Sequence, residues 1–264
     1  MIDNILTIGE HFTLNRTTEV QAPGNIMSDA MIALPMIPVH TVDGTNWGGP
    51  NSTMPDRQNV ARIIYDNRNN RYTYWRLFGD AYVNLNPVKG LNIRSTFGLD
   101  YAQKYQRNFT LPYNTGFLNS DKDAVEMKQE HFTKWMWNAV ATYELEIGKH
   151  RGDVMAGMEL NREDDINFAA YREGFAILTP DYMYPSAGVG QSQASGGAGG
   201  FSLVSFFGKL NYSYADKYLL SFTLRRDGSS RFGSNNKYAT FPSVSLGWRI
   251  SQEAFMEKTK DVID

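Results

Sequence analysis

Two runs of alternating apolar and polar residues near the C-terminal end constrain the fold most tightly. In residues 218–225 every second side chain is leucine or phenylalanine, and in residues 243–250 valine, leucine, tryptophan and isoleucine alternate with serine, glycine and arginine. Side chains in a β-strand point to opposite faces with period two, so each run predicts a strand with one apolar and one polar face. The Gly- and Ser-rich segment between the runs predicts a loop that joins them as a hairpin.

The same alternation recurs along most of the chain. It is found in residues 4–15, 71–86, 91–104, 131–147, 153–163 and 201–214. Together with the hairpin, these runs predict an all-β protein, an antiparallel up-and-down meander of about eight strands, each longer than usual. One short helix is expected within residues 26–34.

The connections between the expected strands alternate between short and long. Tight turns are expected at 87–90, 148–152 and 214–217, and long loops at 16–70, 106–130, 167–200 and, less extended, 228–237. In a meander every second connection lies at the same end, so all the long loops gather on one rim. Outer-membrane barrels show this asymmetry, whereas a soluble sandwich has no physical reason for it. The run of small residues at 195–200 is expected to be flexible loop.

The two faces of the expected strands differ in chemistry. Ten ionised side chains fall on the polar faces of the expected strands or directly after them. Burying them in a packed core would have a large desolvation cost, so we expect them to line a water-filled or plugged lumen. They are Arg76, Asp80, Arg94, Asp100, Lys134, Glu144, Glu159, Lys209, Arg225 and Arg249. Trp135 and Trp137 are expected near the long-loop end of their strand, in an aromatic girdle, although aromatic rings packed beneath loops of a soluble sheet are the alternative.

Composition narrows the class of protein further. The 264 residues carry 28 acidic and 26 basic side chains, so no strong attraction to nucleic acid is expected, and no cysteine is present. No run approaches 18 consecutive apolar residues, which excludes a transmembrane helix. Residues 1–25 lack a basic segment followed by an apolar one, so no signal peptide is recognised. Because an outer-membrane protein needs export, we expect the chain to be a piece of a longer protein, with the signal peptide absent.

No catalytic constellation is recognised, and we expect no enzyme, cofactor or metal. The four histidines are scattered, and the acidic residues at 163–165 lack the spacing of a calcium loop. Residues 225–231 lack the pattern of a phosphate-binding loop. Aromatic residues in the long loops are candidate ligand or partner contacts, because planar rings stack on sugars, although such rings also anchor loops. They are Trp47, Tyr113, Phe117, Tyr182 and Tyr184.

The amino-acid sequence of the C-terminal hairpin resembles a motif of the SusC/RagA-type TonB-linked outer-membrane proteins. In that family a strand ending in RRDGSSRFG, a short loop and FPSVSLGWRIS lie in the transport barrel. The motif residues are Arg225, Arg226, Asp227, Gly228, Ser229, Ser230, Arg231, Phe232, Gly233, Phe241, Pro242, Ser243, Gly247 and Trp248. Residues 147–153, 87–99 and the glycines at 44, 48 and 49 also resemble barrel segments, so the resemblance covers most of the chain.

The resemblance implies a section of a plugged barrel of about 22 strands. Such proteins import glycans or peptides through the outer membrane of Gram-negative bacteria, powered through TonB and paired with a SusD-like surface lipoprotein. Residues 1–264 would then be an incomplete section of the barrel wall, without the plug domain or the TonB contact region. Two alternatives stay open: a soluble carbohydrate-binding β-sandwich, and a β-rich hydrolase with two convergent carboxylates.

Overall fold

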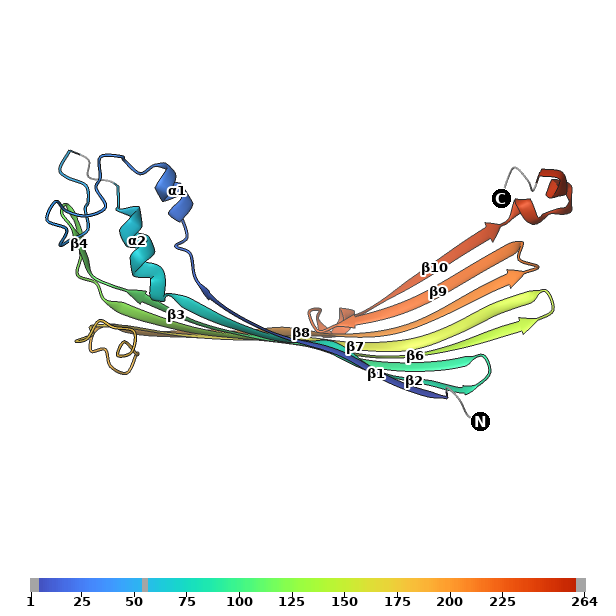
Figure 1. Ribbon diagram of the computed structural model, residues 1–264. Helices are drawn as coiled ribbons and strands as arrows, with labels where there is room; N and C mark the ends of the chain where they lie inside the picture. Colours follow the sequence, from blue (N-terminus) through green and yellow to red (C-terminus); the bar gives the residue numbers. More distant parts are fainter. Residues whose placement is uncertain (1–4, 54–56, 260–264) are drawn as a thin grey trace.

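The protein forms one curved antiparallel sheet, seen in a computed structural model that describes residues 5–53 and 57–259 (Figure 1). Its eight strands follow one another in sequence order. They are β1 (Leu6–Val20), β2 (Arg71–Val88), β3 (Leu91–Thr110), β6 (Ala124–Ile147), β7 (His150–Glu173), β8 (Ser192–Tyr214), β9 (Tyr218–Ser229) and β10 (Tyr238–Trp248).

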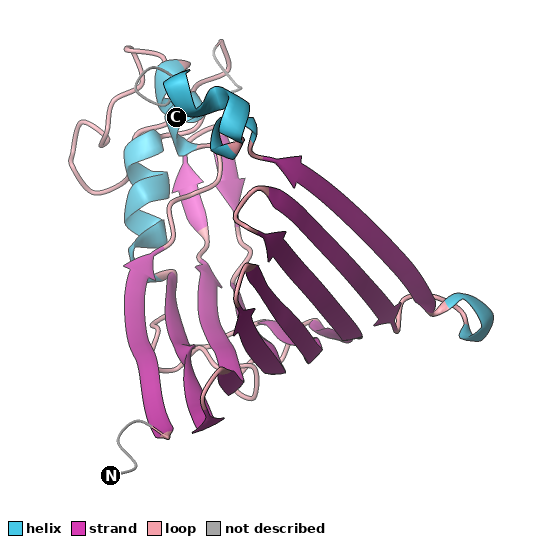
Figure 2. Cartoon of the chain, turned by 90° about the vertical axis from the view of Figure 1, so that its right-hand side faces the viewer, coloured by secondary structure: helices cyan, strands magenta, loops and turns pink. Residues whose placement is uncertain are grey.

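Every strand pairs only with its neighbours in sequence, so the predicted eight-stranded meander is confirmed. The pairing is long and regular, and β6 and β7 stay in register from Ala124↔Glu173 to Ile147↔His150. The sheet is open: β1 and β10 form its two edges and do not pair with each other (Figure 2). An open, curved meander of this kind agrees with the predicted section of a barrel wall.

The short turns are built from residues that adopt left-handed backbone conformations. Gly148 has φ +61° in the turn between β6 and β7, and Gly90 has φ +85° between β2 and β3. Between β8 and β9, Ala215 and Asp216 have φ +51° and +55°. Aspartate adopts such positive φ values more readily than alanine. Two successive left-handed residues match the twist of the flanking strands, so the turn between β8 and β9 holds its hairpin in register.

The strands extend further toward the long-loop rim than predicted, so the expected loop boundaries need correction. The connections are 21–70, 111–123, 174–191 and 230–237 rather than 16–70, 106–130, 167–200 and 228–237. In particular, the small-residue run 195–200 is not a loop but part of β8, paired with β7 from Ser195↔Ala169 to Gly200↔Asp164. Backbone pairing with β7 maintains a strand here although the side chains show no alternation.

The long loops carry the remaining elements. The connection 21–70 contains α1 (Ile26–Met31), which confirms the expected helix, together with α2 (Val60–Asp66) and η1 (Asn67–Asn69). The connection 111–123 contains a small hairpin of β4 (Tyr113–Thr115) and β5 (Leu118–Ser120). Both helices lie over the concave side of the sheet (Figure 1). A turn η2 (Ser234–Asn236) joins β9 to β10.

The segment after β10 lies at the short-turn end of the sheet. It forms η3 (Ile250–Gln252) and η4 (Ala254–Thr259). Between them the Glu253 carboxylate accepts hydrogen bonds from Lys217 Nζ (3.0 Å), the Tyr218 hydroxyl (2.8 Å) and Trp248 Nε1 (3.2 Å). The Lys217 ammonium, followed by the two other donors, lowers the pKa of Glu253. These bonds fasten the segment to the turn between β8 and β9.

Little of the molecule is packed in a core. The one cluster of buried apolar side chains in the described residues combines Phe109, Val125, Phe175 and Met183. It lies where the connection 174–191 folds onto β3 and β6 at the long-loop rim. No described helix has the length and apolar composition that crossing a bilayer requires.

Candidate functional site

The register assigns every side chain of the sheet to one of two faces. One row across the convex face, for example, runs through Leu14, Leu77, Tyr101 and Thr133, whose strands pair directly at these positions. The charged residues predicted to share a polar face do so: Arg76, Asp100, Lys134 and Glu159, for example, lie on the concave face, on the same side as α2. Arg249 is the exception, because β10 ends at Trp248.

The convex face carries an apolar band next to the short turns. On β7 the band comprises the alternate residues from Val154 to Leu160, and on β2 those from Trp75 to Leu85. These side chains are exposed although they are apolar: Val154 is 53% exposed, Leu246 78% and Ile8 69%. Among the described residues no second layer covers them. Glu10, at the β1 edge of the sheet, is the one acidic side chain that lies within the band.

Across the sheet from its first to its last strands, the upper boundary of the band shifts toward the short turns. Above the band, the first polar residue of the convex face on β1 is Arg16, opposite Trp75 of β2. On β9 it is Arg226, which the register connects through Phe206, Met158, Ala139 and Ser95 to Val83 of β2. On β10 it is Thr240, which pairs with Arg226, so the boundary shifts by eight residues along β2 while crossing from β1 to β10.

This shift gives the inclination of the strands. Eight residues correspond to about 26 Å along a strand, and the seven spacings between β1 and β10 to about 34 Å, so a level band requires strands tilted by about 38°. Strands of transmembrane barrels tilt by about 35–45°. At this tilt, the eleven residues from Trp75 to Leu85 span about 28 Å, close to the height of a hydrocarbon layer.

Aromatic rings mark both boundaries of the band. Trp75, Tyr101 and Trp135 lie at its upper edge on successive strands, and Arg16 lies over the Trp75 ring at 5.1 Å. Tyr214 and Tyr218 stack at its lower edge, with ring centroids 6.5 Å apart. Trp135 and Trp137 lie in the middle of β6 rather than near its long-loop end, because β6 extends to Ala124. An aromatic girdle lies at the edge of the apolar band, and Trp135 lies at that edge.

The concave face carries ion pairs both between neighbouring strands and within one strand. Arg76 donates two hydrogen bonds to Asp100, at 2.8 and 2.7 Å. Arg225 contacts Asp227 (2.8 Å) and the Ser205 hydroxyl (3.0 Å), while Lys104 lies 4.0 Å from Glu130. These groups remain partly exposed, as expected of side chains that face water.

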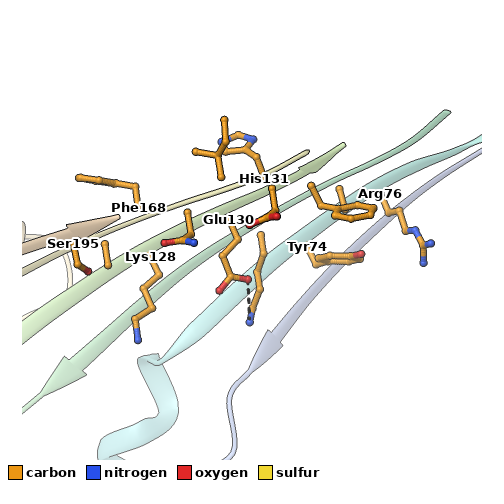
Figure 3. A pocket seen from close by; sticks show the side chains of 14 residues that line it. Tyr74, Arg76, Lys128, Glu130, His131, Phe168 and Ser195 are labelled. Carbon is orange, nitrogen blue, oxygen red and sulfur yellow. Dashed lines mark ion pairs between the residues drawn. The ribbon is translucent and has the colours of Figure 1, made fainter. Parts of the chain in front are cut away.

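A hollow of about 610 Å³ lies on this wall, above the level of the band. Tyr74, Lys104, Lys128, Glu130 and Asp165 contribute to its lining. Figure 3 shows Tyr74, Lys128 and Glu130 pointing to one side of the sheet and His131 to the other. Ammonium, carboxylate and aromatic groups side by side can bind polar solutes such as sugars or peptides.

The structure does not bring the five predicted loop aromatics together. Trp47 stacks on His40 at 4.7 Å and lies 5.3 Å from the Tyr65 ring, and Tyr113 lies under the Arg62 guanidinium at 3.8 Å. Both belong to the connections on the concave side. Phe117, 55% exposed, lies at the tip of the β4–β5 hairpin.

Tyr182 and Tyr184 belong instead to the connection 174–191, which packs against the convex face. The Arg107 guanidinium lies over the Tyr184 ring at 3.9 Å and donates hydrogen bonds to the carbonyl oxygens of Pro180 and Met183 (the latter at 2.7 Å). Sequence reasoning missed Arg107 and Arg62, because nothing in the strand pattern distinguishes an arginine that fastens a loop from a solvated one.

Most of the motif residues form the upper end of the β9–β10 hairpin, and Gly247 and Trp248 lie at its lower end. Gly228 is buried, and a side chain there would collide with the Tyr238 ring. Ser230 donates its backbone N–H to the Ser202 carbonyl (2.9 Å), and its hydroxyl accepts from the Ser202 N–H (2.8 Å). Phe241, Ser243 and Gly247 lie on the concave face and Pro242 and Trp248 on the convex face, so the motif residues build wall and turn. Within the described residues, no group of three or more histidines and carboxylates could hold a metal ion.

Comparisons with known proteins agree with this architecture. A family model described as TonB dependent receptor-like, beta-barrel, matches residues 37–255. TonB-dependent receptor P26 of Formosa agariphila is 31% identical over 239 residues, which cover 87% of this chain and 23% of that protein. TonB-dependent receptor SusC of Bacteroides thetaiotaomicron is 31% identical over 176 residues, 66% of this chain and 17% of that protein.

A solved structure of the RagAB peptide transporter shares the fold. Its chain superposes on 97% of this chain with a TM-score of 0.78 at 18% identity, and 30% of that chain is covered. The chain thus spans about a quarter of the length of the first relatives it matches. The predicted family resemblance is confirmed, and the chain belongs to the TonB-dependent receptor β-barrel family.

Proposed function

We propose that this chain is a sector of the wall of a TonB-dependent nutrient importer of SusC/RagA type in the outer membrane of a Gram-negative bacterium. The observation that carries the proposal is the uncovered apolar band of the convex face, level at a strand tilt of about 38° and edged by aromatic rings. Exposed apolar surface of this extent is costly in water and stable against acyl chains.

The concave face is the side along which the solute passes. Its ion pairs and the hollow beside Lys104 and Glu130 offer donors and acceptors of both signs, which suits polar cargo such as glycans or other large nutrients. The plug domain, which other parts of such a protein supply, would contact the same charged wall. No catalytic role is assigned to any of these residues.

The long-loop rim would meet a SusD-like lipoprotein and the arriving solute. Trp47, Tyr113 and Phe117 are the candidate contacts on the concave side, and Tyr182 and Tyr184 are candidates on the outside of the wall. The TonB system would supply the energy for import.

The location can be tested with the complete protein that carries this sector. We expect it to fractionate with outer membranes and, in vesicles with brominated acyl chains, its tryptophan fluorescence to be quenched. The contribution of each tryptophan is the difference in fluorescence between the unchanged protein and the variant Trp135→Phe or Trp47→Phe. The contribution of Trp135 should be quenched more than that of Trp47. Recovery in the soluble fraction, with both tryptophans equally unaffected, would favour the soluble sandwich and refute the importer.

A further inference from the structure

The permanent positive charge on the convex face of the wall strands comes from arginine alone. On the eight strands the register places six arginines, all above the apolar band, and no lysine on this face. They are Arg16, Arg71, Arg107, Arg162, Arg172 and Arg226. The four lysines of these strands, Lys104, Lys128, Lys134 and Lys209, all lie on the concave face. This separation favours a role for the guanidinium group itself on the outside of the wall.

Carboxylates are scarce on the same face. Among the described strand residues only Glu10, within the band, and Asp164, above it, point outward. Asp164 accepts two hydrogen bonds from Arg162, at 2.7 and 3.0 Å, so the charge of that arginine is neutralised within its own strand. Two further arginines bind the backbone of the connection 174–191, and Arg71 lies well above the band. Two arginines next to the band, on β1 and β9, then remain to be explained.

These two, Arg16 and Arg226, each lie against an aromatic ring instead of a carboxylate. The Arg16 guanidinium lies over the Trp75 ring at 5.1 Å from its centroid, and the Arg226 guanidinium lies over the Tyr238 ring at 5.1 Å. Both arginines are exposed, and neither has an ion-pair partner in the part of the chain that the structure describes. A guanidinium resting on a ring is held in place while its N–H groups stay available to an anion.

The two guanidiniums lie at the level where the apolar band ends. Each belongs to the first polar residue above the band on its strand, and at a strand tilt of about 38° Arg16 and Arg226 differ in height by only about 3 Å. A lipid whose acyl chains contact the band carries its headgroup at this level, because the two are covalently joined. What lies against the arginines therefore follows from what lies against the band.

We propose that Arg16 and Arg226 are binding sites for the phosphate groups of anionic lipid in the leaflet next to the long-loop rim. The guanidinium presents its N–H groups as a planar fork that matches two phosphate oxygens, whereas the ammonium group of lysine is a point charge. The proposal rests on the proposed function, because headgroups reach these side chains only if lipid covers the band. Arg162 is the internal comparison, since Asp164 already occupies its fork.

Two tryptophans report on the lipid beside an arginine with a free fork and beside one whose fork is occupied. Trp75 lies under Arg16, and Trp135 pairs directly with Arg162. The complete protein is reconstituted in phosphatidylcholine vesicles in which a fixed minor share of the lipid, either phosphatidic acid or phosphatidylcholine, is brominated near the headgroup. The contribution of each tryptophan is the difference in fluorescence between a protein and its variant with phenylalanine at that position. The ratio of quenching by the two brominated lipids then measures the local enrichment of phosphatidic acid.

We expect phosphatidic acid to be enriched about fivefold at Trp75 and less than about twofold at Trp135. Arg16→Gln should remove the enrichment at Trp75 and leave Trp135 unchanged. Asp164→Asn releases the Arg162 guanidinium, so it should raise the enrichment at Trp135 to about fivefold and leave Trp75 unchanged. Heat-modifiable migration in electrophoresis confirms that each variant is folded. Enrichment at Trp75 that survives Arg16→Gln, or a value at Trp135 that ignores Asp164→Asn, would overturn the proposal.

The same measurements distinguish a failure of this inference from a failure of the proposed function. Brominated phosphatidylcholine quenches Trp75 only if the convex face contacts lipid, whatever headgroup that lipid carries. Absence of quenching by both brominated lipids would refute the lipid-facing wall and the phosphate sites with it. Equal quenching of Trp75 by the two lipids would leave the lipid contact standing and overturn the phosphate sites alone.

Discussion

Ala141 and Thr142 are adjacent on β6, but the register directs them to opposite faces. Ala141 lies in the middle of the apolar band, beside Ile93 and Ala156, and Thr142 lies on the concave face beside Asn92 and Met155. Arginine at the midplane of a barrel's lipid face costs about 2–4 kcal/mol. We therefore predict that Ala141→Arg lowers the free energy of unfolding of the complete barrel in vesicles by this amount.

Thr142→Arg is the matched control for this prediction. Its guanidinium would enter the aqueous side, near Glu144, and should leave the free energy of unfolding within about 1 kcal/mol of the unchanged protein. Urea unfolding followed by tryptophan fluorescence measures both variants. Equal costs for the two substitutions would show that the convex face does not contact lipid.

Asp43 organises the turn that precedes Trp47. Hydrogen bonds from the hydroxyls of Thr41 and Thr45 lower the pKa of Asp43 from 3.8 to about 2. A carboxyl whose pKa is lower in the folded loop stabilises that loop above its ordinary pKa, and the contribution is lost as the pH falls from about 4 to about 2. We predict that the signal of fluorine-labelled Trp47 shifts in this window, and that Asp43→Asn abolishes the shift. A titration unchanged by Asp43→Asn would assign it to another group.

The connection 174–191 is a rigid element rather than a mobile loop. Arg107 from β3, Asp123 and Arg172 all bind its backbone, and its own Met183 side chain is fully buried. Since Arg107→Ala removes two hydrogen bonds and a ring contact, we predict about tenfold faster protease cleavage within 174–191. Arg71→Ala is the control, because Arg71 lies opposite Arg107 on the same face. Equal acceleration by both would indicate a general effect of charge.

The alternation of apolar and polar residues predicted the strands well only where one face of the sheet is apolar. All eight strands were found from segments such as 71–86 and 201–214, which cross the band. Above the band both faces meet water, so period two disappears and residues 106–110, 124–130, 167–173 and 192–200 were assigned to loops. Pairing with a regular neighbour maintains strands there, and that information lies in the partner rather than in the segment itself.

The candidate site was predictable by face and not by residue. The alternation of side chains along each strand was enough to predict which charged residues share the concave face. Arg76 of β2 and Asp100 of β3, for example, form an ion pair there. The loop aromatics did not, because a loop's path depends on contacts distant in sequence. Tyr184 lies on the outside of the wall since Arg107 holds it there, and Trp47 lies on the inside since it packs with His40 and Tyr65.

At the scale of the whole molecule, the slanted boundary of the band is a property that no single strand carries. Arg16, Arg162 and Arg226 are each the first polar residue above the band on the convex face of their strands, yet they lie in different rows of the sheet. They reach a common level only if the strands are inclined. The membrane, the register and the shear of the barrel are therefore linked, and one measurement tests all three.

We predict that polarised infrared dichroism of the complete protein in oriented bilayers gives a mean strand tilt of about 38° from the membrane normal. The amide bands report the tilt directly, and a lipid-free film of the same protein, without preferred orientation, is the control. A tilt below about 25° would place Arg16 and Arg226 at heights that differ by more than about 10 Å. One arginine of the pair would then lie within the hydrocarbon, where its burial is costly, so the convex band could not be the lipid contact.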